Sequence, residues 1–327
     1  MLARVRGSMS REQLSRRLGY GPNVIYLWER QRRLPSAGVL FRMAELRRPA
    51  LRQPTLRQPT LRQALLQFLG PATECASAIR AGDDITRVLL RWMCGDQSNV
   101  ELAQHTGFDR STLARWRAGK TQPRLSDFLA LLDKTTLRLL DFVGLFVNPA
   151  ELETTREAYA VAAQRQRLAY EVPWSAAVLH ALDLAAYRAA PRHRPQLLAE
   201  HLGLPSAEVE AYLAQLAEAR VIEKHDGLWR EVRVLSIDTR SDFAKNRALK
   251  SHWTAVATDR LARLQPGHEN LFSYNVFAIS SADLAQLREL HLDYFQRVRQ
   301  VVARATGADH VVVMNLQLFA LDEQRPP

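Results

Sequence analysis

Apolar residues recur every three or four positions over most of the chain, which is the spacing of amphipathic helices. The clearest instance is residues 98–124, where the pattern predicts a short helix, a tight turn at Gly107 and a second helix after Asp109. Asp109 can cap that second helix by accepting from its free amides, and glycine allows the positive φ that the turn needs. The apolar seam between the two helices would consist of Leu102, Ala103, Leu113 and Trp116.

The outward side of the second helix, and the loop after it, carry hydrogen-bond donors. Such side chains can lie against a polyanion and donate to base edges. We expect the earlier donors to reach bases and the later ones to bind phosphates, which would fix the register of the protein on double-stranded DNA. The expected base contacts are Arg110, Ser111, Thr112 and Arg115, and the expected phosphate contacts are Arg117, Lys120 and Arg124.

This stretch resembles the helix-turn-helix of lambda-repressor-like regulators of the XRE or Cro class. In that family a helix ends in Leu-Ala, a Gly makes the turn, and a Gly and a Pro follow the recognition helix. The matching residues are Leu102, Ala103, Gly107, Ser111, Trp116, Gly119 and Pro123. The resemblance implies that the second helix enters the major groove. A cytosolic helical hairpin with a solvated basic face is the alternative.

Residues 1–46 look like a shorter, degenerate copy of the same motif. Ser10 would cap a helix that ends at Gly19, and residues 22–30 would form the second helix. The helix before the motif is curtailed to residues 2–6, and Gln31 stands where the resembled family has Gly. The side chains expected to face DNA are Asn23, Tyr26, Arg30, Arg32 and Arg33.

A proline-rich segment at 47–63 separates the two motifs. Its unit Leu-Arg-Gln-Pro-Thr recurs with Pro every five residues, which prevents a continuous helix and predicts a linker. Low-complexity slippage without function is the other interpretation. A second DNA-binding bundle would occupy 64–149, with helices at 61–69, 73–92, 125–132 and 137–147, and a connecting helix would fill 150–173.

Residues 174–237 predict three helices and a β-hairpin, an arrangement that looks like a winged helix. The helices would span 176–187, 195–202 and 206–219, and Asp226-Gly227 would join strands at 221–224 and 229–235. The third helix exposes acidic and amide side chains, and the acidic ones would repel phosphate. We therefore interpret the winged-helix-like domain as a packing or dimerising element. The acidic and amide side chains of the third helix are Glu208, Glu210, Gln215 and Glu218.

The last part, 238–327, alternates strand, helix and strand. Strands are predicted at 272–279 and 310–321, with a helix between them that Ser281 would cap. A family resemblance is carried by residues 277–280 (Phe-Ala-Ile-Ser), the amphipathic helix that follows them, and residues 315–319 (Asn-Leu-Gln-Leu-Phe). Through them the segment from about 174 to 319 resembles a bacterial family, the Fibrobacter major paralogous domain, which has no assigned function. The whole chain is thus expected to be mostly α with a smaller α+β C-terminal part.

The charge of +11 is concentrated at the N-terminus. Residues 1–124 hold 22 Lys and Arg against 9 Asp and Glu, whereas the remainder is nearly neutral, which favours a phosphate-binding module at the front. The excess of Arg over Lys suits bidentate contacts but equally fits a GC-rich genome. Cys75 and Cys94 lack nearby ligand partners, so we expect free thiols, no metal, no cofactor, no membrane span and a cytoplasmic protein.

These observations favour a sequence-specific DNA-binding transcription regulator that acts as a homodimer through its C-terminal half. A second hypothesis is an antitoxin-like or peptide-sensing interaction partner with an apolar groove in the C-terminal half, although aromatic side chains at this density more often belong to a core. Catalysis is not expected, because the chain has no Gly-rich phosphate loop and no Gly-x-Ser-x-Gly. The polar cluster at 238–242 is more simply the start of a helix at 245–263. The operator, any effector and the sign of regulation stay open.

Overall fold

The computed structural model describes residues 1–46, 60–69, 74–232, 242–267, 269–305 and 307–321. The chain divides into two compact units. The first contains Met1–Tyr159 and Ala285–Ala305, and the second contains most of the rest. The predicted linker at 47–63 lies largely outside the described residues, as does the polar cluster at 238–241.

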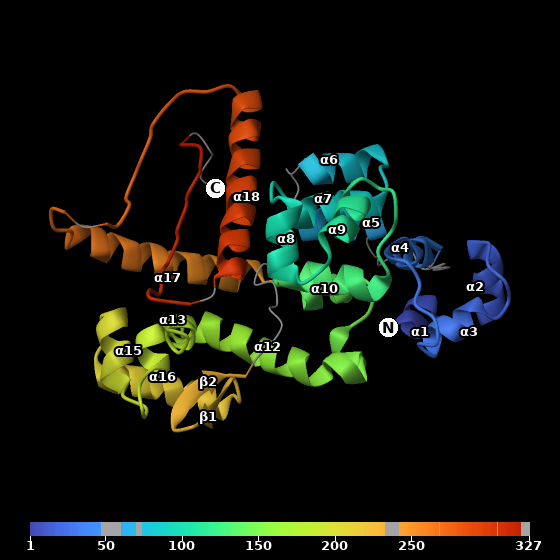
Figure 1. Ribbon diagram of the computed structural model, residues 1–327. Helices are drawn as coiled ribbons and strands as arrows, with labels where there is room; N and C mark the ends of the chain where they lie inside the picture. Colours follow the sequence, from blue (N-terminus) through green and yellow to red (C-terminus); the bar gives the residue numbers. More distant parts are fainter. Residues whose placement is uncertain (47–59, 70–73, 233–241, 268, 306, 322–327) are drawn as a thin grey trace. The chain divides into compact units, whose positions relative to one another are not determined.

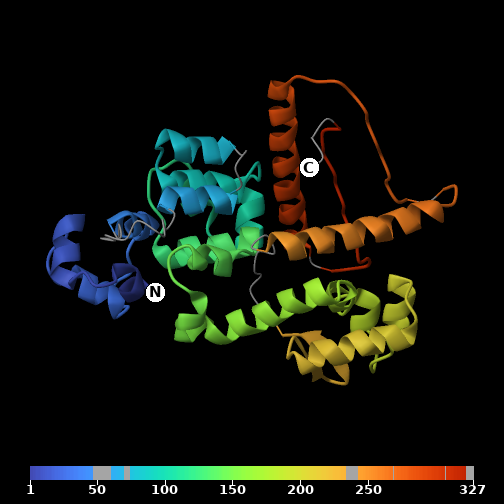
Figure 2. The same cartoon turned by 180° about the vertical axis from the view of Figure 1, so that it is seen from behind.

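Short helices build the first unit (Figures 1 and 2). Residues 1–46 form the first copy of the motif, and α7–α10 form the second. The first copy consists of α1 (Leu2–Arg6), α2 (Arg11–Leu18), α3 (Val24–Glu29) and α4 (Ala37–Leu46). The remaining helices are α5 (Leu61–Leu69), α6 (Glu74–Ala81), α7 (Ile85–Cys94), α8 (Asn99–Thr106), α9 (Arg110–Arg117), α10 (Leu125–Thr136) and α11 (Leu139–Gly144). After a 3₁₀ turn at Pro149–Glu151, α12 (Glu153–Glu171) continues into the second unit.

Side-chain caps begin the helices of both copies. Ser10 and Gln13 form a reciprocal capping box before α2, and Ser98 and Glu101 form the same box before α8. The predicted N-cap at Asp109 is confirmed. Each helix pair therefore starts at a residue that satisfies amides which would otherwise be unpaired.

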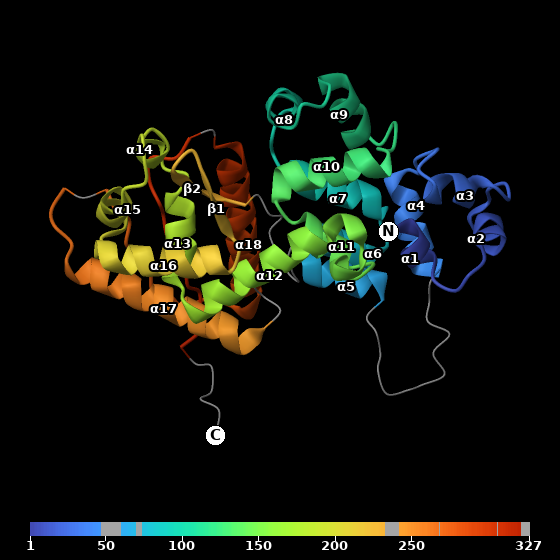
Figure 3. The ribbon, with the colours of Figure 1, turned by 90° about the horizontal axis from the view of Figure 1, so that it is seen from below.

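Both copies share one hydrophobic core. α4 packs against α2 of its own copy and against α7 and α10 of the other (Figure 3). Phe41 on α4 makes an edge-to-face contact with Phe128 on α10, at 5.9 Å between ring centroids, and also contacts Phe142 and Phe146. The first copy is therefore folded against the second.

The second unit contains helices and one hairpin. The helices are α13 (Trp174–Ala181), α14 (Ala185–Arg188), α15 (Pro195–Leu202), α16 (Ser206–Glu218) and α17 (Phe243–Ala262). The last helix, α18 (Ser281–Arg304), begins in this unit, but its residues from Ala285 onward belong to the first unit. Strands β1 (Ile222–His225) and β2 (Leu228–Glu231) pair antiparallel, with Ile222 opposite Glu231. Asp226 and Gly227 both have positive φ, as the predicted two-residue turn requires.

Three predicted helices differ from those observed. The helix predicted at 73–92 is interrupted at Gly82, after which Asp84 caps α7. The one predicted at 176–187 is divided into α13 and α14. Ser280, rather than Ser281, caps α18, since its hydroxyl accepts from the amide of Asp283. In the first two cases, helical periodicity continued through a break in the helix, and in the third the start of the helix is shifted by one residue.

The strands predicted at 272–279 and 310–321 are not formed. Among the described residues the only sheet is the β1–β2 hairpin, and these two segments run without ladder partners. Alternation of apolar and polar residues shows that a segment fits a sheet, but a strand also needs a neighbour to pair with.

The chain is thus mostly α-helical with a small antiparallel sheet in its C-terminal part, as predicted. Among the described helices, none combines the length and the apolar character that crossing a membrane requires.

The two copies make the same left-handed turn after their second helix with different residues. Gln31 has φ of 57° and Gly119 has φ of 70°. Side chains disfavour this region, so we expect Gln31→Gly to stabilise the full chain by about 0.5–1 kcal/mol and Gly119→Gln to destabilise it similarly. Because nothing lies within 4 Å of a Cβ built at Gly119, that loss would come from the backbone alone. Denaturant midpoints that do not move in opposite directions would contradict this.

Candidate nucleic-acid interface

The two copies correspond residue by residue without a gap. Ser10 and Ser98, Gly19 and Gly107, and Trp28 and Trp116 are all separated by 88 positions. The correspondence extends to side-chain packing, since Tyr20 lies edge-on to Trp28 at 5.0 Å and Phe108 lies edge-on to Trp116 at 5.3 Å. α3 and α9 are therefore equivalent helices, each held against its neighbour by the same buried tryptophan.

The N-terminal turn of α9 is held by Asp109. Its carboxylate accepts from the amides of Ser111 and Thr112 and from the Ser111 hydroxyl. The hydrogen bond from the Ser111 side chain, together with the amide of Thr112, lowers the pKa of Asp109, so the cap is ionised at neutral pH. Arg110, Ser111 and Arg115 are exposed and Thr112 is half-buried. The proposed base contacts therefore lie on a helix with a fixed start.

Arg117 is placed differently from the other predicted donors. Its guanidinium is half-buried, and Nη1 donates to the Gln97 carbonyl at 2.7 Å and to Asn99 Oδ1 at 2.9 Å. It therefore ties the end of α9 to the start of α8. Lys120 and Arg124, in the loop after α9, are exposed and remain candidates for phosphate contacts.

In the first copy, aromatic and basic side chains gather around α3. Tyr26 is half-buried, and the guanidiniums of Arg11 and Arg30 lie 5.4 and 5.9 Å from its ring centroid. Asn23, at the N-cap position of α3, is exposed. Arg30, Arg32 and Arg33 are exposed as well. The five predicted residues thus lie on one helix and the loop that follows it.

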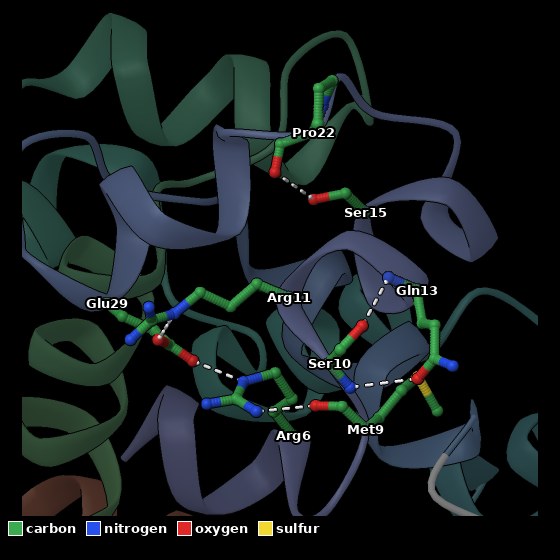
Figure 4. Close-up of polar contacts among 8 residues, drawn as sticks. All are labelled: Arg6, Met9, Ser10, Arg11, Gln13, Ser15, Pro22 and Glu29. Atoms are coloured by element: carbon green, nitrogen blue, oxygen red, sulfur yellow. Dashed lines mark hydrogen bonds and ion pairs between the residues drawn. The ribbon is translucent and has the colours of Figure 1, made fainter.

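Glu29 anchors α3 to the two preceding helices (Figure 4). Oε1 accepts from Arg6 Nε at 2.7 Å and Oε2 from Arg11 Nε at 2.5 Å. Arg6 also donates to the Met9 carbonyl. Burial raises the pKa of Glu29, whose side chain is 6% exposed, but the bonds from Arg6 and Arg11 outweigh it and leave the pKa below its usual value.

This network was not predicted from the sequence. The signal was available in the spacing of the two copies, because Glu29 corresponds to Arg117 and Arg11 corresponds to Asn99. In both copies the last residue of the second helix is thus bonded to the first residue of the first helix. The residue that makes this bond is negative in the first copy (Glu29) and positive in the second (Arg117). These positions orient α3 and α9.

The acidic helix of the second unit presents no comparable surface. Glu208, Glu210, Gln215 and Glu218 are exposed on α16, as predicted. Glu210 is paired with His193, at 3.0 Å between Oε1 and Nε2. Carboxylates at this density repel phosphate, so α16 is not part of the candidate interface.

Comparison with known families finds two matches. The model described as "Domain of unknown function (DUF4423)" matches residues 155–321. A model described as "Helix-turn-helix" matches residues 1–46, which are α1–α4. The N-terminal copy is therefore a helix-turn-helix. No curated protein and no solved structure matches the chain.

Removing the charge of Glu29 should destabilise the first copy. We expect Glu29→Gln to cost about 1–3 kcal/mol of unfolding free energy at neutral pH, because two guanidiniums lose a charged acceptor. Glu12→Gln is the matched control: it breaks the exposed pair with Arg16, which is worth about 0.3–0.5 kcal/mol.

The pH dependence checks the same carboxylate. Since the folded pKa of Glu29 is lowered, its contribution is complete above the unfolded pKa of about 4.3 and is lost as pH falls through the folded pKa. The stability difference between wild type and Glu29→Gln should therefore shrink in acid. A difference that stayed constant in urea titrations down to low pH would contradict the assignment.

Proposed function

The chain belongs to the DUF4423 family, and we propose that it is a sequence-specific DNA-binding regulator of transcription. The observation that carries the proposal is the pair of equivalent helices, α3 and α9, each with exposed donors and a fixed orientation. The N-terminal excess of positive charge supplies the attraction to phosphate.

In the proposed mechanism α9 lies in the major groove. Arg110 and Arg115 would donate to base edges, each good bidentate pair contributing about 1–3 kcal/mol of discrimination. Ser111 and Thr112 would complete the contact near the helix start. Lys120 and Arg124 would bind phosphates and set the register. Arg117 would act by positioning α9, since one of its nitrogens is bonded within the protein.

The C-terminal half would make the protein a homodimer. Exposed apolar side chains support this, among them Phe277 and Phe319, which are 56% and 65% exposed. They lie in the two segments with a strand pattern and no ladder partner, which a second copy could pair. The hairpin with α13, α15 and α16 would be a winged-helix-like packing element. We also keep, as part of this proposal, the resemblance of the C-terminal half to the Fibrobacter major paralogous domain.

The same exposed segments favour one alternative. A protein or peptide partner, rather than a second copy, could cover them, and DNA binding would then be secondary. A bound effector in this half would couple sensing to DNA binding under either reading. Neither the regulator proposal nor this alternative includes a catalytic step.

DNA binding is tested with the Arg110→Ala, Arg115→Ala double variant. The purified chain should bind its own upstream region with an affinity that falls as salt rises, at a log-log slope of about −0.9 per phosphate contact. The variant should lose about 1–3 kcal/mol of specificity for each bidentate pair removed. The control removes two arginines of the second unit instead, Arg247 on α17 and Arg263 directly after it (Arg247→Ala with Arg263→Ala). Equal losses in both variants, or no binding by wild type, would count against the proposal.

Dimerisation is tested by mass in solution. Light scattering should give twice the chain mass, and Phe277→Asp with Phe319→Asp should give the monomer, since burying a carboxylate at an apolar interface is unfavourable. Val100→Asp, at a residue 45% exposed in the first unit, is the control and should leave the dimer intact. A wild-type monomer that gains mass only with a cellular partner would favour the alternative.

A further inference from the structure

We propose that the two helix-turn-helix copies form a pseudo-dimer within one chain, which reads two unlike half-sites about a local two-fold axis. This inference rests on the proposed DNA-binding function and adds the arrangement of the site on DNA. It follows from how the loops after α3 and α9 meet, and from what the equivalent positions of these helices hold.

The loops after α3 and α9 pair with each other. Ser36 and Arg124 form an antiparallel bridge. The Ala37 amide donates to the Pro123 carbonyl at 3.0 Å, and the Leu125 amide donates to the Pro35 carbonyl at 2.8 Å. The loops are thus held together by two backbone hydrogen bonds.

These contacts are reciprocal. Pro35 and Pro123, Ser36 and Arg124, and Ala37 and Leu125 are each separated by 88 positions, the offset that relates the two copies throughout. The amide of Ala37 therefore bonds to Pro123, the equivalent of Pro35. In return, the amide of Leu125, the equivalent of Ala37, bonds to Pro35 itself. Such exchange is the mark of an isologous two-fold contact, here made inside one chain.

Burial supports the pairing. Pro35, Ala37, Pro123 and Leu125 are buried, and the helices that begin at this bridge, α4 and α10, contact each other. Phe41 and Phe128 fill the space between them. The bridge is therefore part of the shared core of the first unit.

A two-fold rotation leaves directions along its axis unchanged. Any surface that faces along this axis in one copy faces the same way in the other. The inference therefore requires that the exposed sides of α3 and α9 face along the axis, so that both approach DNA from the same side. Duplex DNA has two-fold axes perpendicular to its length, and paired helix-turn-helix units use them by occupying successive major-groove half-sites. One chain would then cover both half-sites.

The half-sites should differ, because the two helices carry different side chains at equivalent positions. Asn23 corresponds to Ser111, and Leu27 corresponds to Arg115. Arg30 corresponds to Ala118. An arginine that could select guanine thus stands in the last turn of α9 and directly after α3. The operator would be an imperfect palindrome.

The pairing is tested by locking it. Ser36 and Arg124 are a non-hydrogen-bonded antiparallel pair, whose Cα atoms lie about 4.5 Å apart, within the range that a disulfide bridges. In the full chain, Ser36→Cys with Arg124→Cys should therefore oxidise to an intramolecular disulfide, mapped by mass spectrometry. Oxidised wild type controls for Cys75 and Cys94.

Oxidised and reduced forms of this variant are compared on the same DNA, so any loss from removing Arg124 cancels. We expect formation of the disulfide to change the affinity for DNA by less than about fivefold, which is the smallest effect of one mismatched base pair. Failure of the disulfide to form, or loss of specific binding on oxidation alone, would overturn the pseudo-dimer.

The half-sites are tested by selection from randomised DNA. Asn23→Ala with Arg30→Ala should relax base preference on one side of the local axis, and Ser111→Ala with Arg115→Ala on the other, by about 5- to 150-fold per affected base pair. If only the α9 variant changes preference, the regulator proposal stands and the two-half-site inference fails. If wild type selects no sequence, the proposed function itself fails. These variants decide the matter even where the cysteine variant binds DNA too weakly to compare.

Discussion

The pairing of the two loops at Ser36 and Arg124 is the contact on which the DNA-binding part of this protein depends. The helices of the first copy are too short to be stable alone, since α1 has five residues and α3 has six. They gain stability because α4, which starts at this bridge, is buried between its own copy and α7 and α10. A degenerate helix-turn-helix can therefore remain folded as half of a symmetric pair.

Electrostatics sets the second constraint. A surface rich in arginine attracts phosphate, yet the same charges repel one another unless some are bonded internally. In the first copy one carboxylate, Glu29, accepts hydrogen bonds from Arg6 and Arg11. In the second copy Arg117 donates to a backbone carbonyl and to a side-chain amide oxygen instead. Equivalent positions thus fix the same helix with opposite charges, and leave the outward donors of α9 exposed.

The second unit has a different balance. Its helical part has its own core around Tyr187, Leu198 and Leu213, while the segments near its C-terminus expose apolar side chains. Exposed apolar area of this kind is usually covered by a partner, and the strand-like alternation of these segments fits pairing with another chain. Each chain would then bind a complete DNA site with its two helix-turn-helix copies. It would associate with another chain through the exposed apolar segments of its C-terminal half.

The sequence by itself determined the helical class, the motif at both copies, the caps at Ser10 and Asp109, and the hairpin turn at Asp226-Gly227, because each follows from interactions within a few residues. The tertiary structure decided the rest. Only packing could show that Arg117 bonds inward, that Glu29 joins three helices, and that Pro35–Ala37 meets its own equivalent 88 residues away. It also left the segments at 272–279 and 310–321 outside any strand ladder among the described residues, because a strand is defined by a neighbour that its own sequence does not contain.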